Sequence, residues 1–169
     1  HQEAGRPARI VAKMNQLEDR EVCQALIAAS TAGVPIDLIV RGFSVLRPGV
    51  AGSTERIRIL SVIGRFLEHS RIFYFRNGAQ HEADGDFFIG SADWMHRNLE
   101  ARVEAVTPVV DPGLRRELWD VIETYLTDHR SAWDMQSDGH YRQRRSELPG
   151  QPGLGAQQAL MERTRRRGR

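Results

Sequence analysis

The chain has 169 residues, of which 40% are hydrophobic and 27% are charged, and its formal net charge at pH 7 is +2. This length fits one domain with a sizeable core, or one domain plus a tail. No apolar run approaches the ~20 residues of a membrane-spanning helix, and so small a net charge does not imply a polyanion-attracting field around the whole molecule. The single cysteine excludes an intramolecular disulfide and a thiolate metal cluster, which makes a reducing cytoplasm the expected compartment.

The first 40 residues predict a strand–helix–strand unit. Residues 9–14 alternate loosely, residues 19–32 place apolar side chains at helical spacing, and residues 36–40 form a nearly continuous apolar run. This order favours a parallel, buried pair of strands. Ligands of open α/β sheets bind beyond the carboxyl ends of the strands, and Arg41 directly follows the second strand.

The rest of the chain predicts four strands, a long helix, a hairpin and a short terminal helix, at residues 57–63, 72–75, 87–89, 102–110, 111–128, 133–145 and 157–165. We therefore expect an α/β domain at residues 9–146, with a mixed or parallel sheet flanked by helices. Residues 1–8 are expected to form a flexible lead-in, and residues 147–169 a tail rich in Pro, Gly and Arg that contains the terminal helix. Because the chain begins with His1 and not with Met, we interpret it as a fragment or a processed chain.

Two motifs carry the candidate chemistry. His69 lies two residues before Arg71 at the start of an apolar strand, and a later strand ends in Gly90-Ser91-Ala92-Asp93. Positions i and i+2 of a strand point the same way, so His69 and Arg71 share a face if the strand already runs at residue 69. A lone histidine here is most often a satisfied core group, but an imidazole, a guanidinium and a small-residue turn can also surround one phosphoryl group.

The order His-x-Arg, then Gly-Ser-x-Asp, resembles the half-site of the phospholipase D superfamily, which uses His-x-Lys and Gly-Ser-x-Asn. Arg71 and Asp93 depart from that pattern, which argues against a standard phospholipase or nuclease. Several blocks, in the correct order, resemble instead the C-terminal, second phospholipase D-like domain of the class 1 polyphosphate kinases. The resemblance covers about residues 9–145 and rests on residues 13–15, 34–42, 46–49, 64–75, 90–99 and 109–112.

The resemblance implies an enzyme that reversibly transfers the terminal phosphate of ATP to polyphosphate through a phosphohistidine. In this family two similar α/β domains each supply a histidine, and the nucleophilic histidine and the Mg²⁺ ligands lie upstream of the part that this chain matches. His69 corresponds to the catalytic histidine of the second half-site, and Arg41 to the arginine that binds the nucleotide phosphates. We predict that Arg41 and His69 bind substrate, with Arg71 and Ser91 as weaker candidates, and that this chain holds no metal.

The resemblance also sets expectations for partners. The chain by itself is expected to lack kinase activity while retaining weak binding of phosphate, polyphosphate or nucleotide. Its expected partners are ATP or ADP, polyphosphate, the upstream domains of the same polypeptide and further copies of itself. The expected location is the cytoplasm, with association of the parent enzyme with a membrane as the alternative.

The residues also leave other interpretations open. Glu68 and Asp93 are interpreted as orienting partners of arginines, and four arginines as the lining of a polyphosphate path or as surface ion pairs: Arg47, Arg65, Arg71 and Arg97. Two alternatives to the kinase remain: a homodimeric phospholipase D-like phosphodiesterase, and a non-catalytic module that binds polyanions.

Overall fold

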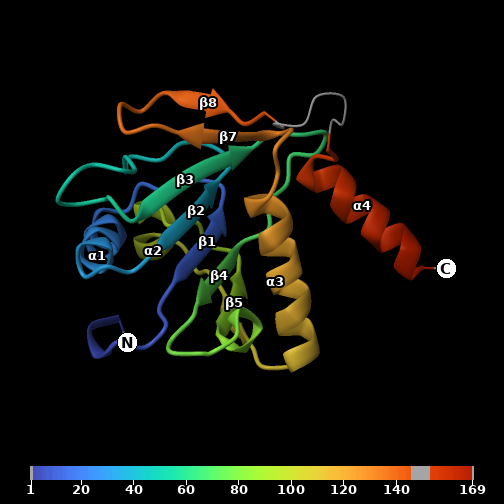
Figure 1. The fold of residues 1–169 in the computed structure, drawn as a ribbon, viewed down its shortest axis with the longest axis horizontal. Coiled ribbons are helices and arrows are strands. Elements are labelled where there is room, and N and C mark those ends of the chain that lie inside the picture. Colours follow the sequence, from blue (N-terminus) through green and yellow to red (C-terminus); the bar gives the residue numbers. More distant parts are fainter. Residues whose placement is uncertain (1, 146–152, 169) are drawn as a thin grey trace.

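The computed structural model describes residues 2–145 and 153–168. Within these residues the chain forms one mixed sheet of eight strands in the order β6-β5-β4-β1-β2-β3-β7-β8 (Figure 1). The strands are β1 (Ile10–Met14), β2 (Ile36–Val40), β3 (Ile57–Val62), β4 (Ile72–Phe75), β5 (Asp86–Gly90), β6 (Val106–Val109), β7 (Ala132–Met135) and β8 (Tyr141–Gln143). Strands β1, β2 and β3 pair in parallel, and every other neighbouring pair is antiparallel. The expected α/β fold with a mixed sheet is confirmed.

Helices cover both faces of this sheet. The α-helices are α1 (Arg20–Thr31), α2 (His96–Glu100), α3 (Pro112–Leu126) and α4 (Ala156–Arg167), and two short 3-10 helices are η1 (Gln2–Ala4) and η2 (Glu82–Asp84). The carboxylates of Asp19 and Asp111 cap α1 and α3 by accepting hydrogen bonds from the backbone N–H groups of Val22 and Leu114, each at 2.9 Å. No helix in the described ranges combines the length and apolar character needed to cross a membrane.

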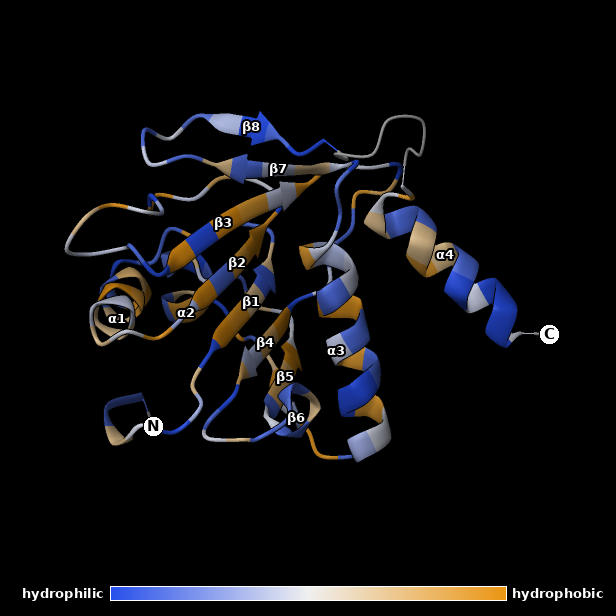
Figure 2. Cartoon of the chain, viewed as in Figure 1, coloured by the Kyte–Doolittle hydropathy of each residue, from blue (hydrophilic) through white to orange (hydrophobic). Residues whose placement is uncertain are grey.

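The alternation of side chains along the strands divides the core into two layers. One layer lies between the sheet and α3. It includes Val11, Ile39 and Tyr74 of the sheet and Ile122 and Tyr125 of α3. The other packs under α1 and includes Ala12, Leu26, Leu38, Val40 and Phe73. Figure 2 shows hydrophobic residues concentrated along the central strands and hydrophilic residues over much of α4.

One predicted strand is shorter than expected, and another has its predicted bounds and therefore does not reach back to His69. The predicted strand at 102–110 forms only as β6, because the backbone of Ala105 is bonded to Ser91: Ala105 N–H donates to Ser91 Oγ at 3.1 Å, and Ser91 N–H to the Ala105 carbonyl at 3.0 Å. Strand β4 begins at Ile72, so no strand aligns His69 with Arg71. The backbone N–H of Ser70 donates instead to the Glu68 carboxylate at 2.6 Å, which forms a local turn.

The predicted hairpin and terminal helix agree with the structure to within a few residues. The predicted hairpin is β7 and β8, and the predicted terminal helix is α4. Helix α2 and the 3-10 helices η1 and η2 were not predicted, because segments of three to five residues give too short a hydrophobic pattern; η1 lies in the expected lead-in. Part of the predicted tail, residues 146–152, lies outside the described residues.

Candidate active site

The predicted site residues meet at one edge of the sheet because of the strand order. Arg41 directly follows β2, and Asn15 directly follows β1, at the carboxyl ends of two parallel strands. Strand β4 runs antiparallel to β1, so residues 68–71, which precede β4, reach the same edge. Strand β5 runs antiparallel to β4, and this returns residues 91–93 to that edge as well.

Asp93 is the hub of a buried hydrogen-bond network at this edge. Its side chain accepts the backbone N–H of Asn15 at 2.8 Å and the Asn15 side-chain amide at 3.2 Å. It also accepts Nε of Arg71 at 3.0 Å and Nη2 at 3.3 Å, while the backbone N–H of Asp93 donates to Asn98 at 3.0 Å. Asp93 is 5% exposed and Asn15 6%, so these bonds replace water almost completely. The charge of Arg71 is therefore balanced within the chain.

Arg41 is oriented by the same network. Its Nε donates to Asn15 Oδ1 at 3.1 Å, and its backbone carbonyl accepts the hydroxyl of Ser61 at 2.8 Å. Neither terminal nitrogen of its guanidinium has a hydrogen-bond partner among the described residues. Arg41 is half-buried, so a fixed guanidinium presents two free nitrogens at the carboxyl edge of the sheet. This is the geometry that binds phosphate bidentately.

A buried lysine holds the turn that precedes β4. Lys13 pairs with the Glu68 carboxylate and donates from Nζ to the hydroxyl and carbonyl of Ser70 at 3.0 and 3.2 Å. Nζ also lies 4.8 Å from the centre of the Tyr125 ring. Burial lowers the pKa of Lys13, the Glu68 carboxylate opposes this change, and Arg41 and Arg71 lower the pKa further by repulsion. Lys13 thereby fixes the turn that contains His69.

His69 is exposed on this turn. Its backbone carbonyl accepts Nη1 of Arg71 at 2.8 Å, so Arg71 connects the His69 backbone to Asp93. Its imidazole forms no hydrogen bond with a side chain or backbone group of the described residues. The imidazole is thus available to a ligand, on a backbone that is held by Lys13 and Arg71.

Ser91 contributes less to this arrangement than the other predicted residues. Its hydroxyl donates to the Glu104 carboxylate and accepts the Ala105 N–H, so it joins the β5 end to the segment before β6. The interpretation of Asp93 as the partner of an arginine agrees with its contacts, whereas the same interpretation of Glu68 is wrong, because Glu68 pairs with Lys13. Asn15 and Lys13 were not predicted as site residues, although both belong to the Lys-Met-Asn block at the end of the first strand.

The Glu68 carboxylate is expected to stabilise the fold in a pH-dependent way. Burial alone would raise the pKa of Glu68, but the hydrogen bonds from Lys13 and Ser70 outweigh it, and the folded-state pKa lies below its ordinary value. The stabilisation is therefore complete above the unfolded pKa of about 4.3 and is lost as the pH falls through the folded pKa. Glu68→Gln should lower the free energy of unfolding by about 1.5–3 kcal/mol at pH 7, with no difference from wild type once Glu68 is protonated.

Urea unfolding between pH 7 and pH 3 measures this difference. Glu123→Gln, at an exposed position of α3, is the matched control and should stay within about 0.5 kcal/mol of wild type throughout. A Glu68→Gln deficit that persists unchanged into acid would contradict the role of the carboxylate charge.

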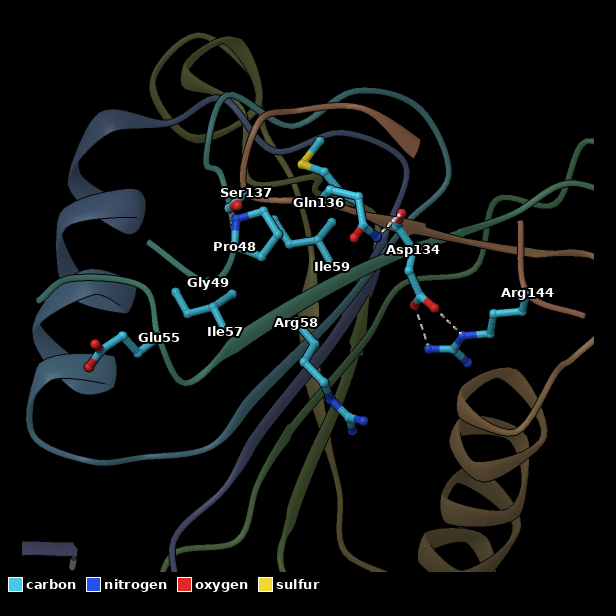
Figure 3. Close-up of a pocket in the computed structure, with 11 residues that line it drawn as sticks. Pro48, Gly49, Glu55, Ile57, Arg58, Ile59, Asp134, Gln136, Ser137 and Arg144 are labelled. Carbon is cyan, nitrogen blue, oxygen red and sulfur yellow. Dashed lines mark hydrogen bonds and ion pairs between the residues drawn. The ribbon is translucent and has the colours of Figure 1, made fainter. Parts of the chain in front are cut away.

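One small cleft lies at this site, and a larger pocket lies away from it. A small cleft is lined by Lys13, Arg41, Glu68, Tyr125 and Gln157, among others. The pocket in Figure 3, of about 410 Å³, lies between the loop at Pro48–Gly49, the first residues of β3 and the β7–β8 hairpin, and contains the Asp134–Arg144 ion pair. It holds none of the predicted site residues, so we assign the chemistry to the edge where Arg41 and His69 lie.

The described residues give no fit to a metal ion. No group of three or more His, Cys, Asp or Glu side chains is placed to bind a cation within residues 2–145 and 153–168. The two carboxylates of the site, Glu68 and Asp93, are each paired with a cationic side chain. Neither is free to act as a Mg²⁺ ligand in this conformation.

Known proteins are similar to this chain in both sequence and fold. The family model described as polyphosphate kinase C-terminal domain 2 matches residues 1–157. The polyphosphate kinase of Thermosynechococcus vestitus is 54% identical over 164 residues, which is 97% of this chain and 22% of that protein. The crystal structure of polyphosphate kinase from Porphyromonas gingivalis matches with a TM-score of 0.89 at 38% identity, over 98% of this chain and 24% of that chain.

A more distant likeness concerns the fold alone. Nuc from Salmonella typhimurium, a phospholipase D family member, matches with a TM-score of 0.53 at 16% identity, over 82% of each chain. The chain spans about a fifth of the length of the Thermosynechococcus relative. From the family model, the sequence identity and the shared fold, this chain belongs to the family of the polyphosphate kinase C-terminal domain.

Proposed function

We propose that this chain is the C-terminal catalytic part of a longer polyphosphate kinase, which reversibly transfers the terminal phosphate of ATP to polyphosphate. The observation that carries the proposal is the meeting of Arg41 and His69 at one sheet edge in a member of this family. The partners proposed with it are ATP or ADP, polyphosphate and the upstream domains of the same polypeptide. A cytoplasmic location belongs to the proposal, because ATP is available there and the buried Cys23 needs no oxidising compartment.

Arg41 and His69 have different roles in this mechanism. Phosphoryl transfer depends mainly on positioning and on neutralising charge on the phosphate oxygens. The free nitrogens of Arg41 bind two phosphate oxygens, and Asn15 sets their direction. The exposed imidazole of His69 donates a hydrogen bond or a proton to the phosphoryl group or the leaving oxygen. The nucleophilic histidine is supplied by the preceding domain, so no residue of this chain forms the phosphohistidine.

The Arg71–Asp93 ion pair distinguishes this site from the half-site of the phospholipase D superfamily. Arg71 gives one nitrogen to the His69 carbonyl and two to Asp93, so it orients the turn and is not a free phosphate clamp. A phosphodiesterase would need that cation for its substrate. The ion pair thus supports the kinase over the homodimeric hydrolase.

A chimera tests the proposed function. This chain replaces the matching segment of the Thermosynechococcus vestitus polyphosphate kinase, and ATP-dependent polyphosphate synthesis and the reverse reaction with ADP are measured. We expect both activities in the chimeric kinase and neither in the isolated chain, because the upstream histidine is supplied only by the chimera. The control is hydrolysis of bis(p-nitrophenyl) phosphate by the isolated chain, which should be absent. A folded but inactive chimera, together with hydrolysis by the isolated chain, would overturn the proposal.

A further inference from the structure

A basic groove lies beside the candidate site, between α4 and two loops. Its walls are the segment after β3, the segment before β7 and the first turns of α4, and its volume is about 390 Å³. The charged lining residues are Arg65, Arg130, Arg165 and Glu162. The groove is therefore lined by three cations and one anion.

The three arginines of this groove are available to a ligand. All are exposed, and none forms an ion pair with an acidic residue in the described ranges. Other arginines of α4 differ, because Arg163 pairs with Asp120 and Arg167 pairs with Glu117 on α3, the latter at 3.0 Å. Helix α4 thus uses one set of arginines to bind α3 and leaves Arg165 on the groove side.

The walls of the groove are held together closely. A Cβ atom added to Gly64 would collide with the Gln157 amide, and one added to Gly155 would collide with the Ser131 hydroxyl. Asp128 is buried in the loop between α3 and β7. Its carboxylate accepts the Ala156 N–H at 2.7 Å and thereby fixes the first residue of α4. The segments that line the groove are therefore held in place by their contacts with one another.

Gln157 connects the groove to the candidate site. Its side chain lines both the groove and the small cleft that contains Lys13, Arg41 and Glu68. Its amide bonds both backbone groups of Phe66, accepting the N–H at 2.8 Å and donating to the carbonyl at 2.9 Å. From Gln157 to Arg165, α4 extends about 12 Å, since each residue of an α-helix rises about 1.5 Å. A ligand with several phosphate groups can therefore extend from the cleft along the helix.

We propose that this groove is a second binding site for polyphosphate, which holds the phosphates that are distant from the transfer centre. The inference rests on the proposed function and extends it from the reacting phosphate to the rest of the chain. Guanidinium groups suit this ligand because they bind phosphate oxygens bidentately and keep their charge at any physiological pH. The groove should increase affinity for long chains and leave the binding of short ones nearly unchanged.

A matched pair of triple variants tests the groove by direct binding. Arg65→Gln/Arg130→Gln/Arg165→Gln removes the groove cations, and Arg20→Gln/Arg56→Gln/Arg116→Gln removes equal charge from exposed arginines elsewhere. Calorimetric titration of each chain with long-chain sodium polyphosphate should show at least about tenfold weaker binding for the groove variant only. Its salt dependence, the slope of log K against log salt, should become shallower by about 2–3, since each lost phosphate contact removes about one unit. The affinity for tripolyphosphate should differ less than about twofold among the three proteins, because this ligand is too short to contact the candidate site and the groove at the same time.

The kinetic counterpart uses the chimeric kinase. The groove variant should raise the KM for long polyphosphate in the reverse reaction and leave kcat and the KM for ADP unchanged. If the two triple variants lose affinity for long-chain polyphosphate equally, or neither loses any, the inference that the groove binds polyphosphate is wrong. If the chimera is inactive but the groove variant still binds polyphosphate more weakly than the control variant, the proposed function is wrong and the groove remains a polyphosphate-binding site. If the chimera is fully active and all three proteins bind polyphosphate equally, the proposed function is supported and the groove is not a polyphosphate site. The single variant Arg165→Gln, at an exposed helix position, should show part of the loss and checks that the effect does not come from misfolding.

Discussion

His69→Ala in the chimeric kinase is expected to reduce polyphosphate synthesis by about 10²- to 10⁴-fold, the usual contribution of a positioned acid or base. The imidazole is exposed at the carboxyl edge of the sheet, and its backbone is held by Arg71 and, through Ser70, by Lys13. Alanine removes the ring without touching these backbone contacts. The loss should therefore appear in kcat, with the free energy of unfolding of the isolated chain unchanged to within about 0.5 kcal/mol.

His81→Ala is the matched control for this experiment. His81 is also exposed, precedes η2 and makes no side-chain capping bond there. The His81 variant should synthesise polyphosphate at the rate of the unmodified chimera. Equal rates in the His69 and His81 variants would remove His69 from the catalytic site while leaving the family membership intact.

Asp93→Ala is expected to produce the largest loss of stability among the substitutions at this site. The carboxylate accepts hydrogen bonds from the Asn15 backbone, the Asn15 side chain and two nitrogens of Arg71. Its removal leaves Arg71, whose side chain is 20% exposed, without its counter-charge, and leaves Asn15 donors unpaired. Breaking a buried pair in this way costs about 3–5 kcal/mol, which urea unfolding of the isolated chain measures directly.

The control for this experiment is Asp84→Ala, an exposed aspartate of η2, which should stay within about 0.5 kcal/mol of wild type. The double variant Arg71→Ala/Asp93→Ala should recover part of the loss, because no unpaired guanidinium remains. Asp93→Ala should also weaken the binding of nucleotide phosphates, since Asn15 then no longer orients Arg41. If Asp93→Ala unfolds like Asp84→Ala, Asp93 is not the hub of the network.

Helices and central strands were predictable from local patterns. The run at residues 36–40 is continuously apolar because β2 is buried on both faces, and Asp111 with Pro112 marks the first turn of α3. The His-x-Arg motif indicated His69, and the position of Arg41 directly after the apolar run at residues 36–40, together with the family resemblance, indicated Arg41. These features are encoded within a few residues of one another, which is why a linear pattern reports them.

What the sequence by itself determined is the α/β class, the main elements, the family and the candidate residues. Only the tertiary structure decided how those residues are partnered. Lys13 and Glu68 are 55 residues apart, and Asp93 lies 78 residues from Asn15, so their contacts depend on β5, β4, β1 and β2 being neighbours in the sheet. The structure also places the start of β4 at Ile72, after His69 and Arg71, and brings Gln157 to Phe66. The physical reason is that strand order and side-chain pairing are set by the burial of the whole core, and local periodicity carries no information about either.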